Sequence, residues 1–439
     1  MELAWVRMLD GLMSCRMTPL VAFWLASSAA IAQQVPPGEE PLTFDFSGEL
    51  RERFESVRNP LFGLASPDDN DYLLHRVMLS GELRHVDNLR VFAQVVSGFT
   101  SGWAGSPPTT QDDELDLLQA YVEPVFPVGG ARLALRLGRQ EMSFGAARLV
   151  SVRESPNIRR TFDGIRAIWT RDRRSASAFF VRPVFPEQGV FDDQSSDRQR
   201  FWGLYASDIA ERISGLKFDV YYLGLDRADA EFAVGVAHER RHTVGVRWFG
   251  ARVAWDWNIE TAGQWGSFGA SNISAWTASM DVGYEFAANR LPFRIGLKAD
   301  AASGDRNPDD RELGTFNPLF PKLSYFSEAN LATPANLLDL QPNVRLSLTD
   351  RLRVHASWDA LWKHEAADAF YAPPLTAVDG TSLSKSREIG WQASLLIEWQ
   401  MTEQIEFGAT YVFFEPRAVA VQAQGSAGRF VGAWLRCTF

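Results

Sequence analysis

Cysteine is scarce in this sequence. Cys15 falls within an N-terminal stretch that we expect to be removed, which leaves Cys437 as the only other cysteine. One cysteine cannot form an internal disulfide, and no spacing of histidine, cysteine and acid is typical of a metal site. We therefore expect no metal and no cofactor, and we interpret Cys437 as a small apolar residue rather than a reactive thiol.

Long apolar runs are also rare. Residues 18–31 form a short apolar stretch after Arg16, and it ends in Ala30-Ile31-Ala32, which fits a small-residue cleavage site. This pattern predicts a signal peptide over residues 1–32, cleaved near Ala32, and a periplasmic segment over 33–41. A core helix or a membrane anchor is the alternative interpretation of the apolar stretch.

After residue 32, no stretch reaches the roughly 18 apolar residues of a spanning helix. The mature chain is therefore soluble, or it crosses a membrane as strands. The net charge of -10 argues against nucleic acid as a partner. It says little about a channel interior, where the local charge decides.

Period-two alternation, by contrast, is abundant. Leu42, Phe44 and Phe46 alternate with Asp45 and other polar residues, and the pattern recurs to the C-terminus. Because successive strand residues point to opposite faces, each such segment has an apolar and a charged face. A membrane barrel turns the apolar face toward lipid and lines its lumen with the charged one. Many of the 15 tryptophans lie near the ends of the apolar stripes, as in aromatic girdles.

The pattern predicts an all-β fold, an antiparallel transmembrane β-barrel of about eighteen strands over residues 42–439. The expected strands are 42–56, 71–86, 89–102, 114–126, 131–143, 161–171, 174–184, 198–207, 214–224, 240–249, 251–263, 270–286, 292–302, 336–348, 351–364, 386–400, 404–416 and 428–439.

Short connections alternate with long ones between these strands, as expected for short periplasmic turns and long extracellular loops. A large soluble all-β protein is the alternative. The expected long connections are 57–70, 103–113, 144–160, 185–197, 225–239, 303–335 and 365–385.

The last expected strand ends in Phe439, with apolar residues at alternate positions before it. This resembles the terminal signal read by the outer-membrane assembly machinery. It predicts the outer membrane of a Gram-negative envelope, with lipid and lipopolysaccharide as neighbours. Acidic loop residues, such as those near 112 and 192, suit divalent cations that bridge to lipopolysaccharide, although plain solvation also explains them.

Several motifs resemble the alginate export family of outer-membrane porins. They are residues 135–141 (LRLGRQE), 160–166 (RTFDGIR), 314–321 (GTFNPLFP) and 336–340 (NLLDL). The segment Ser155-Pro156-Asn157 departs from the family in lacking an Asp-Trp pair, which leaves the fold of that loop open. The resemblance implies an eighteen-stranded monomeric barrel that carries an acidic polysaccharide such as alginate, or a smaller anionic or organic solute. A periplasmic export partner is compatible with it.

Passage of a polyuronate requires fixed positive charge in a wet lumen, and arginine can hold a carboxylate with two hydrogen bonds. Several weak sites in series conduct a polymer, whereas one tight site would trap it. Structural ion pairs are the alternative role for each such residue. The candidates by strand phase are Arg51, Arg53, Arg76, Arg136, Arg166, Arg247, Arg294, Lys298, Arg345 and Arg353, with Asp339 among the interspersed acids.

The loop before residue 160 is the most basic, and we predict that it folds inward as a constriction. It contains Arg148, Arg153 and Arg160. We add Arg139, which a bulge at Gly138 would turn into the lumen. Asp163, from the second motif, completes the set of candidate site residues.

Two other function classes remain open. An outer-membrane enzyme needs a nucleophile, a base and an orienting group, and no Ser-His or Asp-His signature accompanies the histidines. We therefore expect no catalytic residues. An adhesin or structural barrel would need a blocked lumen, for which the 303–335 connection is long enough.

Overall fold

The computed structural model describes residues 42–66, 69–86, 88–209, 216–287 and 291–439. The expected signal peptide and the 33–41 segment lie outside the described residues. Among the described residues, no helix is both long and apolar enough to span a membrane.

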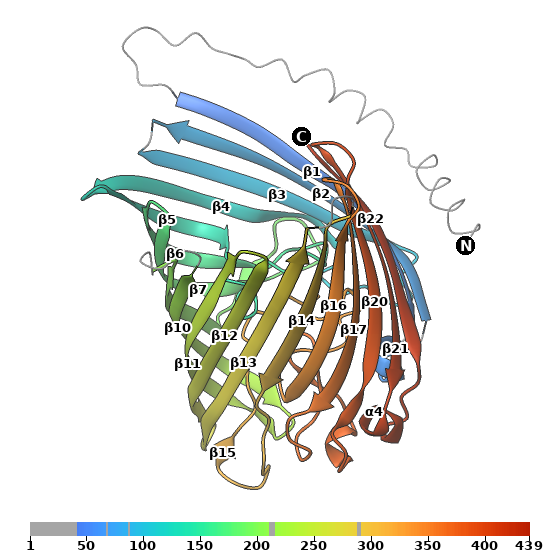
Figure 1. The fold of residues 1–439 in the computed structure, drawn as a ribbon. Helices are drawn as coiled ribbons and strands as arrows, with labels where there is room; N and C mark the ends of the chain where they lie inside the picture. The colour runs from blue at the N-terminus through green and yellow to red at the C-terminus, as the bar shows by residue number, and fades with distance from the viewer. Residues whose placement is uncertain (1–41, 67–68, 87, 210–215, 288–290) are drawn as a thin grey trace. The chain divides into compact units, whose positions relative to one another are not determined.

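Eighteen long antiparallel strands form a closed barrel in the described part of the chain (Figure 1). The predicted fold class is confirmed, and most expected strand ends lie close to the observed ones. The strands are β1 (Leu42–Arg58), β2 (Asp69–His85), β3 (Leu89–Ser101), β4 (Asp113–Val128), β5 (Ala131–Glu141), β6 (Thr161–Arg171), β7 (Arg174–Phe185), β9 (Gln199–Ser207), β10 (Lys217–Phe232), β11 (Gly235–Arg252), β12 (Trp255–Phe268), β13 (Ser271–Phe286), β14 (Phe293–Ala302), β16 (Leu337–Ser347), β17 (Leu352–Lys363), β20 (Glu388–Gln400), β21 (Ile405–Pro416) and β22 (Gly428–Thr438).

Short elements occupy some of the connections. They are the two-residue strands β8 (Gln194–Ser195), β15 (Glu312–Leu313), β18 (Tyr371–Ala372) and β19 (Thr376–Ala377), and the helices α3 (Pro60–Gly63), η1 (Thr381–Leu383) and α4 (Ala418–Gln422).

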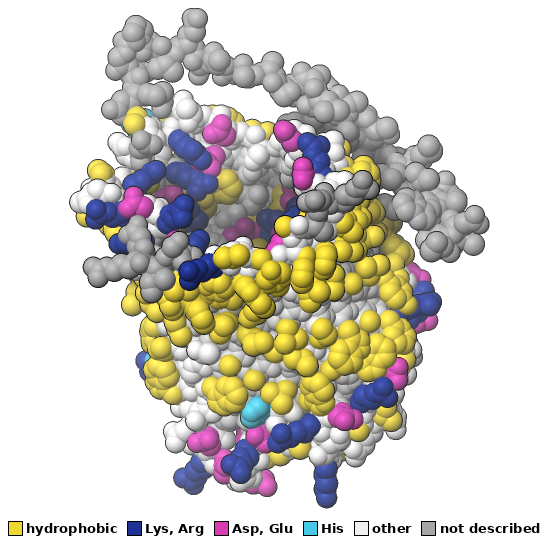
Figure 2. All heavy atoms as spheres, in the orientation of Figure 1, with side chains coloured by type: hydrophobic (Ala, Val, Ile, Leu, Met, Phe, Trp, Pro, Cys, Tyr) yellow, Lys and Arg dark blue, Asp and Glu magenta, His cyan; other side chains and the backbone are white. Residues whose placement is uncertain are grey.

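Along most of their length the strands place apolar residues outward and charged residues inward. On β1, Phe44 is 67% exposed, whereas Arg51 and Arg53 are 3% and 4% exposed. A soluble sandwich would reverse this order. Figure 2 shows the result on one face, where hydrophobic side chains form a broad band and charged side chains gather at its two ends. The band is the surface expected to face lipid.

The barrel closes where β1 pairs with β22, from Glu49 opposite Thr438 to Arg58 opposite Arg429. The amide of Phe439 donates to the carbonyl of Gly48 at 3.1 Å, which extends the pairing to the last residue. The expected terminal strand therefore is the closing strand.

The connections at the two ends differ in length. Tight turns such as 129–130 and 172–173 define what we call the turn rim. The opposite end, the loop rim, carries the longer connections 59–68, 102–112, 142–160, 186–198, 303–336, 364–387 and 417–427.

One expected long loop is wrong. Residues 225–239 continue β10 to Phe232 and resume as β11 at Gly235, so the connection is a tight turn. The hairpin persists because Phe232 is buried against the ring of Phe268, 5.3 Å away between ring centroids, and near Tyr371. The turn between β12 and β13, at 269–270, is equally short, so the expected strict alternation of short and long connections fails at this rim.

Candidate functional site

Two connections from the loop rim fold into the barrel and join. We call residues 142–160 the first inward loop and residues 303–336 the second inward loop. Ser151 donates its amide to the carbonyl of Phe320 at 2.9 Å, and the Phe320 amide donates to Leu149, also at 2.9 Å. Lys322 donates to Ala147 at 3.0 Å. The lumen is therefore crossed by a short two-stranded junction, as predicted for the first loop and left open for the second.

Glu154 anchors the first inward loop to the barrel wall. Its carboxylate accepts a hydrogen bond from Arg76 and forms an ion pair with Arg159 at 2.6 Å, while Arg51 donates to its backbone carbonyl at 2.6 Å. Burial raises the pKa of Glu154, but Arg76 and Arg159 outweigh burial and leave that pKa lowered at about 2. The predicted residues Arg51 and Arg76 thus bind the loop itself.

Arg148 fastens the same loop to the opposite wall and to the second inward loop. Its guanidinium donates to Glu260 on β12 at 2.9 Å and to the hydroxyl of Tyr325 at 2.8 Å. Lys298 on β14 donates to the carbonyl of Tyr325 at 2.6 Å. Tyr325 was not among the predicted site residues, although it follows the 314–321 motif closely. Both predicted cations therefore position the junction.

Arg153 and Arg160 differ from their neighbours, because neither forms an ion pair with a described acid. Arg153 is 8% exposed, and its one side-chain hydrogen bond, at 3.4 Å, goes to the carbonyl of Pro321. Arg160 lies 5.9 Å from the ring centres of both Phe185 and Phe320.

Electrostatics at this pair is unfavourable for positive charge. Burial lowers the pKa of Arg160 to about 10. Burial, and next the charge of Arg160, lower the pKa of Arg153. Both groups remain cationic at neutral pH. An anion that enters between the inward loops would therefore contact two partly desolvated guanidinium groups, neither of which is paired with a carboxylate of the described residues.

Arg166 on β6 is a third cation of this kind. It donates to the hydroxyl of Ser177 at 3.1 Å and lies over the ring of Phe144. Its ladder neighbour Arg136, by contrast, is paired with Glu123 at 2.6 Å. Neighbouring lumen arginines therefore differ in how far their charge is compensated.

The other predicted basic residues of the strands face the lumen and lie beside acids. Separations range from 2.6 Å for Arg136 to 3.9 Å for Arg353. The pairs are Arg53 with Glu328, Arg136 with Glu123, Arg247 with Asp219, Arg294 with Asp256 and Asp281, Arg345 with Glu285, and Arg353 with Glu398.

Arg139 and Asp163 do not face the lumen, which corrects their expected place. They pair with each other across β5 and β6, on the strand face that also carries the exposed residues Leu137 and Ile165. Arg139 holds both carboxylate oxygens of Asp163, at 3.0 and 3.1 Å. The ladder passes Gly138 without an inserted residue, so no bulge reverses the alternation.

Asp339 faces the lumen as expected, close to Asp300 and Asp359. Neither carboxylate oxygen of Asp339 has a hydrogen-bond partner among the described residues. A cavity of about 330 Å³ lies between the second inward loop and the wall near these strands. Its charged lining includes Asp256, Asp281, Arg294, Lys298, Lys322, Glu328 and Arg345.

A glutamate, a histidine and a serine form a hydrogen-bonded chain on the outward face near the loop rim. The His75 ring nitrogens lie 2.6 Å from Glu52 and 3.0 Å from the hydroxyl of Ser101. The three residues come from β1, β2 and β3, so only strand register brings them together. The sequence shows no Ser-His signature, so sequence spacing did not indicate this arrangement.

Comparisons with known proteins agree with the barrel. Residues 43–433 match the family described as alginate export. No curated protein matches the chain in sequence. Among solved structures, OpdO of Pseudomonas aeruginosa superposes with a TM-score of 0.60 at 10% identity, covering 90% of this chain and 97% of that one.

Two further solved structures are similar. OccAB1 of Acinetobacter baumannii has a TM-score of 0.58 at 11% identity, covering 90% of this chain and 96% of that one. A BenF-like porin of Pseudomonas fluorescens has a TM-score of 0.57 at 8% identity, and the match covers 90% of this chain and 98% of that one. At these identities the likeness concerns the fold.

Proposed function

Because the chain belongs to the alginate export family, we propose that this outer-membrane channel conducts an acidic polysaccharide such as alginate. The loop rim then faces the cell exterior and the turn rim faces the periplasm. In this arrangement the polymer passes the junction of the two inward loops.

The observation that carries the proposal is the uncompensated pair Arg153 and Arg160. Most other lumen arginines form an ion pair with an acid of the barrel wall, which largely neutralises their charge. These two, on the loop that crosses the lumen, retain charge that a uronate carboxylate can satisfy. A planar guanidinium suits a carboxylate because it can donate two parallel hydrogen bonds.

The remaining lumen supports movement rather than capture. Alternating acids and bases along the wall, such as Arg294 between Asp256 and Asp281, offer a polyanion many partial contacts. Each contact competes with an existing ion pair, so each is weak. A series of weak sites permits conduction, whereas one strong site would hold the polymer.

The direct test is conductance of the purified protein in a planar bilayer. The wild-type channel should be anion-selective, and oligouronate should block its current while a neutral oligosaccharide of equal length should not. The double variant R153A/R160A should lose most of the selectivity and the block. R306A, which removes an exposed cation of the second inward loop, is the matched control. Cation selectivity of the wild type without block would overturn the proposal.

The alternative is a channel for small anionic or organic solutes. The backbone junction between Ser151 and Phe320 favours it, since a lumen crossed by two hydrogen-bonded loops leaves narrower passages than an open barrel. Liposome swelling separates the two functions. Fast entry of monomeric uronates and dicarboxylates, with no block by oligouronate, would favour the small-solute channel.

A second candidate function, hydrolysis at the outward face, rests on Ser101, His75 and Glu52. In that chemistry His75 takes the proton of the Ser101 hydroxyl as its oxygen attacks an ester carbonyl, and Glu52 orients the ring. The ester C–O bond then breaks as His75 returns the proton to the departing alcohol, and water releases the acyl group from Ser101 by the same route. The candidate predicts that a fluorophosphonate probe labels wild-type protein and not S101A. Equal labelling of both proteins, or of neither, removes it.

A further inference from the structure

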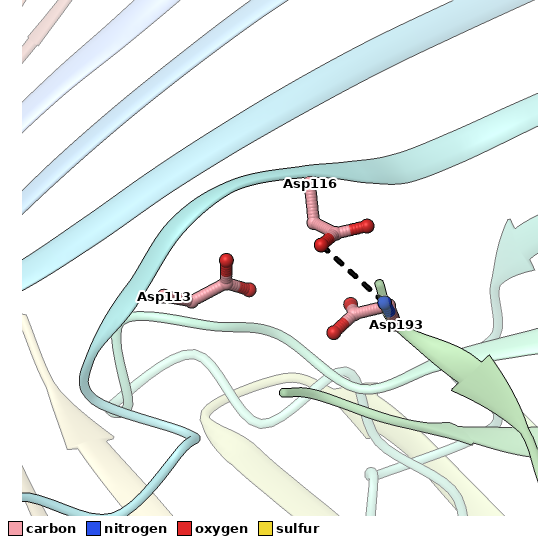
Figure 3. A group of neighbouring side chains, drawn as sticks. All are labelled: Asp113, Asp116 and Asp193. Atoms are coloured by element: carbon pink, nitrogen blue, oxygen red, sulfur yellow. Dashed lines mark hydrogen bonds between the residues drawn. The ribbon is translucent and has the colours of Figure 1, made fainter. Parts of the chain in front are cut away.

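Three carboxylates converge near the loop rim, outside the lumen contacts described above. Asp113 and Asp116 belong to the start of β4, and Asp193 belongs to the connection between β7 and β9 (Figure 3). One oxygen from each lies within 4.8 Å of the others. The sequence pointed to the acidic residues near 112 and near 192 separately, but nothing in their spacing indicated that Asp193 meets the other two.

Asp113 is the most unusual member of the group. It is 0% exposed, and neither of its carboxylate oxygens has a hydrogen-bond partner among the described residues. In Figure 3 its carboxylate points toward those of Asp116 and Asp193. Asp116 is 2% exposed. A buried carboxylate without a partner is strongly unfavourable, so such a group normally has a bound cation or a proton.

The backbone holds the carboxylates together. The amide of Phe191 donates to the carbonyl of Leu115 at 2.9 Å, which aligns the 187–193 segment alongside β4. The amide of Asp192 then donates to a carboxylate oxygen of Asp116 at 3.0 Å. The convergence is therefore built into the pairing of two segments rather than arising from a chance side-chain rotamer.

Neighbouring cations do not neutralise the group. No described lysine or arginine forms an ion pair with Asp113 or Asp116. The guanidinium of Arg139 lies 4.0 Å from the Asp193 carboxylate and is already hydrogen-bonded to both oxygens of Asp163. One shared arginine cannot balance four carboxylates.

We propose that Asp113, Asp116 and Asp193 bind a calcium ion. The donors are all carboxylate oxygens, which suit a hard divalent cation and offer nothing to metals that prefer nitrogen or sulfur. Calcium accepts irregular oxygen sets completed by water and backbone carbonyls, whereas magnesium demands a near-octahedral set. The ion ties the 186–198 connection to β4 and fixes the wall beside Arg139. The site is independent of which solute the channel carries.

Calorimetry on the folded barrel in detergent, stripped with a chelator, tests the proposal. Calcium should bind at one equivalent, and D113N/D116N should weaken binding at least tenfold. D309N/D310N, which neutralises two exposed acids of the second inward loop, should bind as the wild type does. Absence of saturable calcium binding, tighter binding of magnesium than of calcium, or equal binding by D113N/D116N would overturn the site.

Thermal unfolding gives a readout that does not depend on measuring affinity. Without calcium, D113N/D116N should unfold at a higher temperature than the wild type, because the substitution removes repulsion between buried carboxylates. With calcium the order should reverse, since only the wild type gains the bound ion. A variant that is less stable than the wild type by the same margin in both conditions would assign these residues to ordinary packing instead.

Discussion

Gly48 and Phe439 exchange two backbone hydrogen bonds at the seam of the barrel. Gly48 donates to the Phe439 carbonyl at 2.8 Å and accepts from the Phe439 amide at 3.1 Å. The phenyl ring covers the α-carbon of Gly48, where any side chain would overlap it. The terminal aromatic therefore has a structural role in closure besides any role in assembly.

We expect G48V to destabilise the closed barrel, because the added methyl groups must displace the ring of Phe439. Overpacking of this kind costs about 1–3 kcal/mol. Heat-modifiable mobility in gel electrophoresis and urea unfolding measure the effect. G263V is the control, since nothing lies within 4 Å of a β-carbon at Gly263. Equal stability of the two variants would show that the ring moves aside at no cost.

The strands could be predicted because lipid imposes a simple rule on them. An apolar outward face and a polar inward face alternate residue by residue, as on β1 with Phe44 outward and Arg51 inward. That alternation is local, so a single sequence carries it. The prediction was wrong at Arg139 because we expected an exception to this rule: the bulge at Gly138 is absent, and the alternation continues through it.

The candidate site could be predicted only in part. The basic first inward loop was identified from its composition, which is again local. The contact of this loop with the second inward loop could not be predicted, because Ser151 and Phe320 are distant in the chain and no periodic pattern links them. Composition also could not distinguish Arg148, which is bound to Glu260, from Arg153, which has no acidic partner among the described residues.

The anchor at Glu154 predicts a change in channel behaviour in acid. Its pKa in the folded protein is lowered to about 2, below the ordinary value of roughly 4.3. The ionised form is thus favoured by folding, so its contribution is complete above the ordinary pKa and disappears as pH falls toward 2. Open-channel current noise should therefore rise between about pH 4.5 and 2 as the loop loosens.

The variant E154Q should show the high current noise already at pH 7, with little further change in acid. E312Q removes an exposed acid of the second inward loop and should behave as the wild type. If wild-type noise were constant down to pH 2, other contacts would suffice to hold the first inward loop.

Removing Arg148 should be more damaging than removing Arg353. Arg148 and Glu260 are both nearly buried and lie 2.9 Å apart, so R148A leaves an uncompensated carboxylate and should cost about 3–5 kcal/mol. Arg353 is largely exposed and 3.9 Å from Glu398, so R353A should cost about 0–1 kcal/mol. Urea unfolding followed by tryptophan fluorescence compares them, and R148A/E260Q should recover part of the loss. Equal costs would contradict the structural role of Arg148.

A disulfide between the inward loops can show whether the junction must open during transport. Val150 and Phe320 form an isolated bridge, which places their α-carbons close enough for V150C/F320C to form one. If a polymer requires the loops to part, oxidation should abolish oligouronate passage and leave the small-ion current unchanged. If the loops are a fixed constriction, oxidation should change neither. The reduced protein is its own control, because reductant restores the free loops in the same sample. Loss of the small-ion current on oxidation would instead indicate that ions also pass through the junction only when it opens.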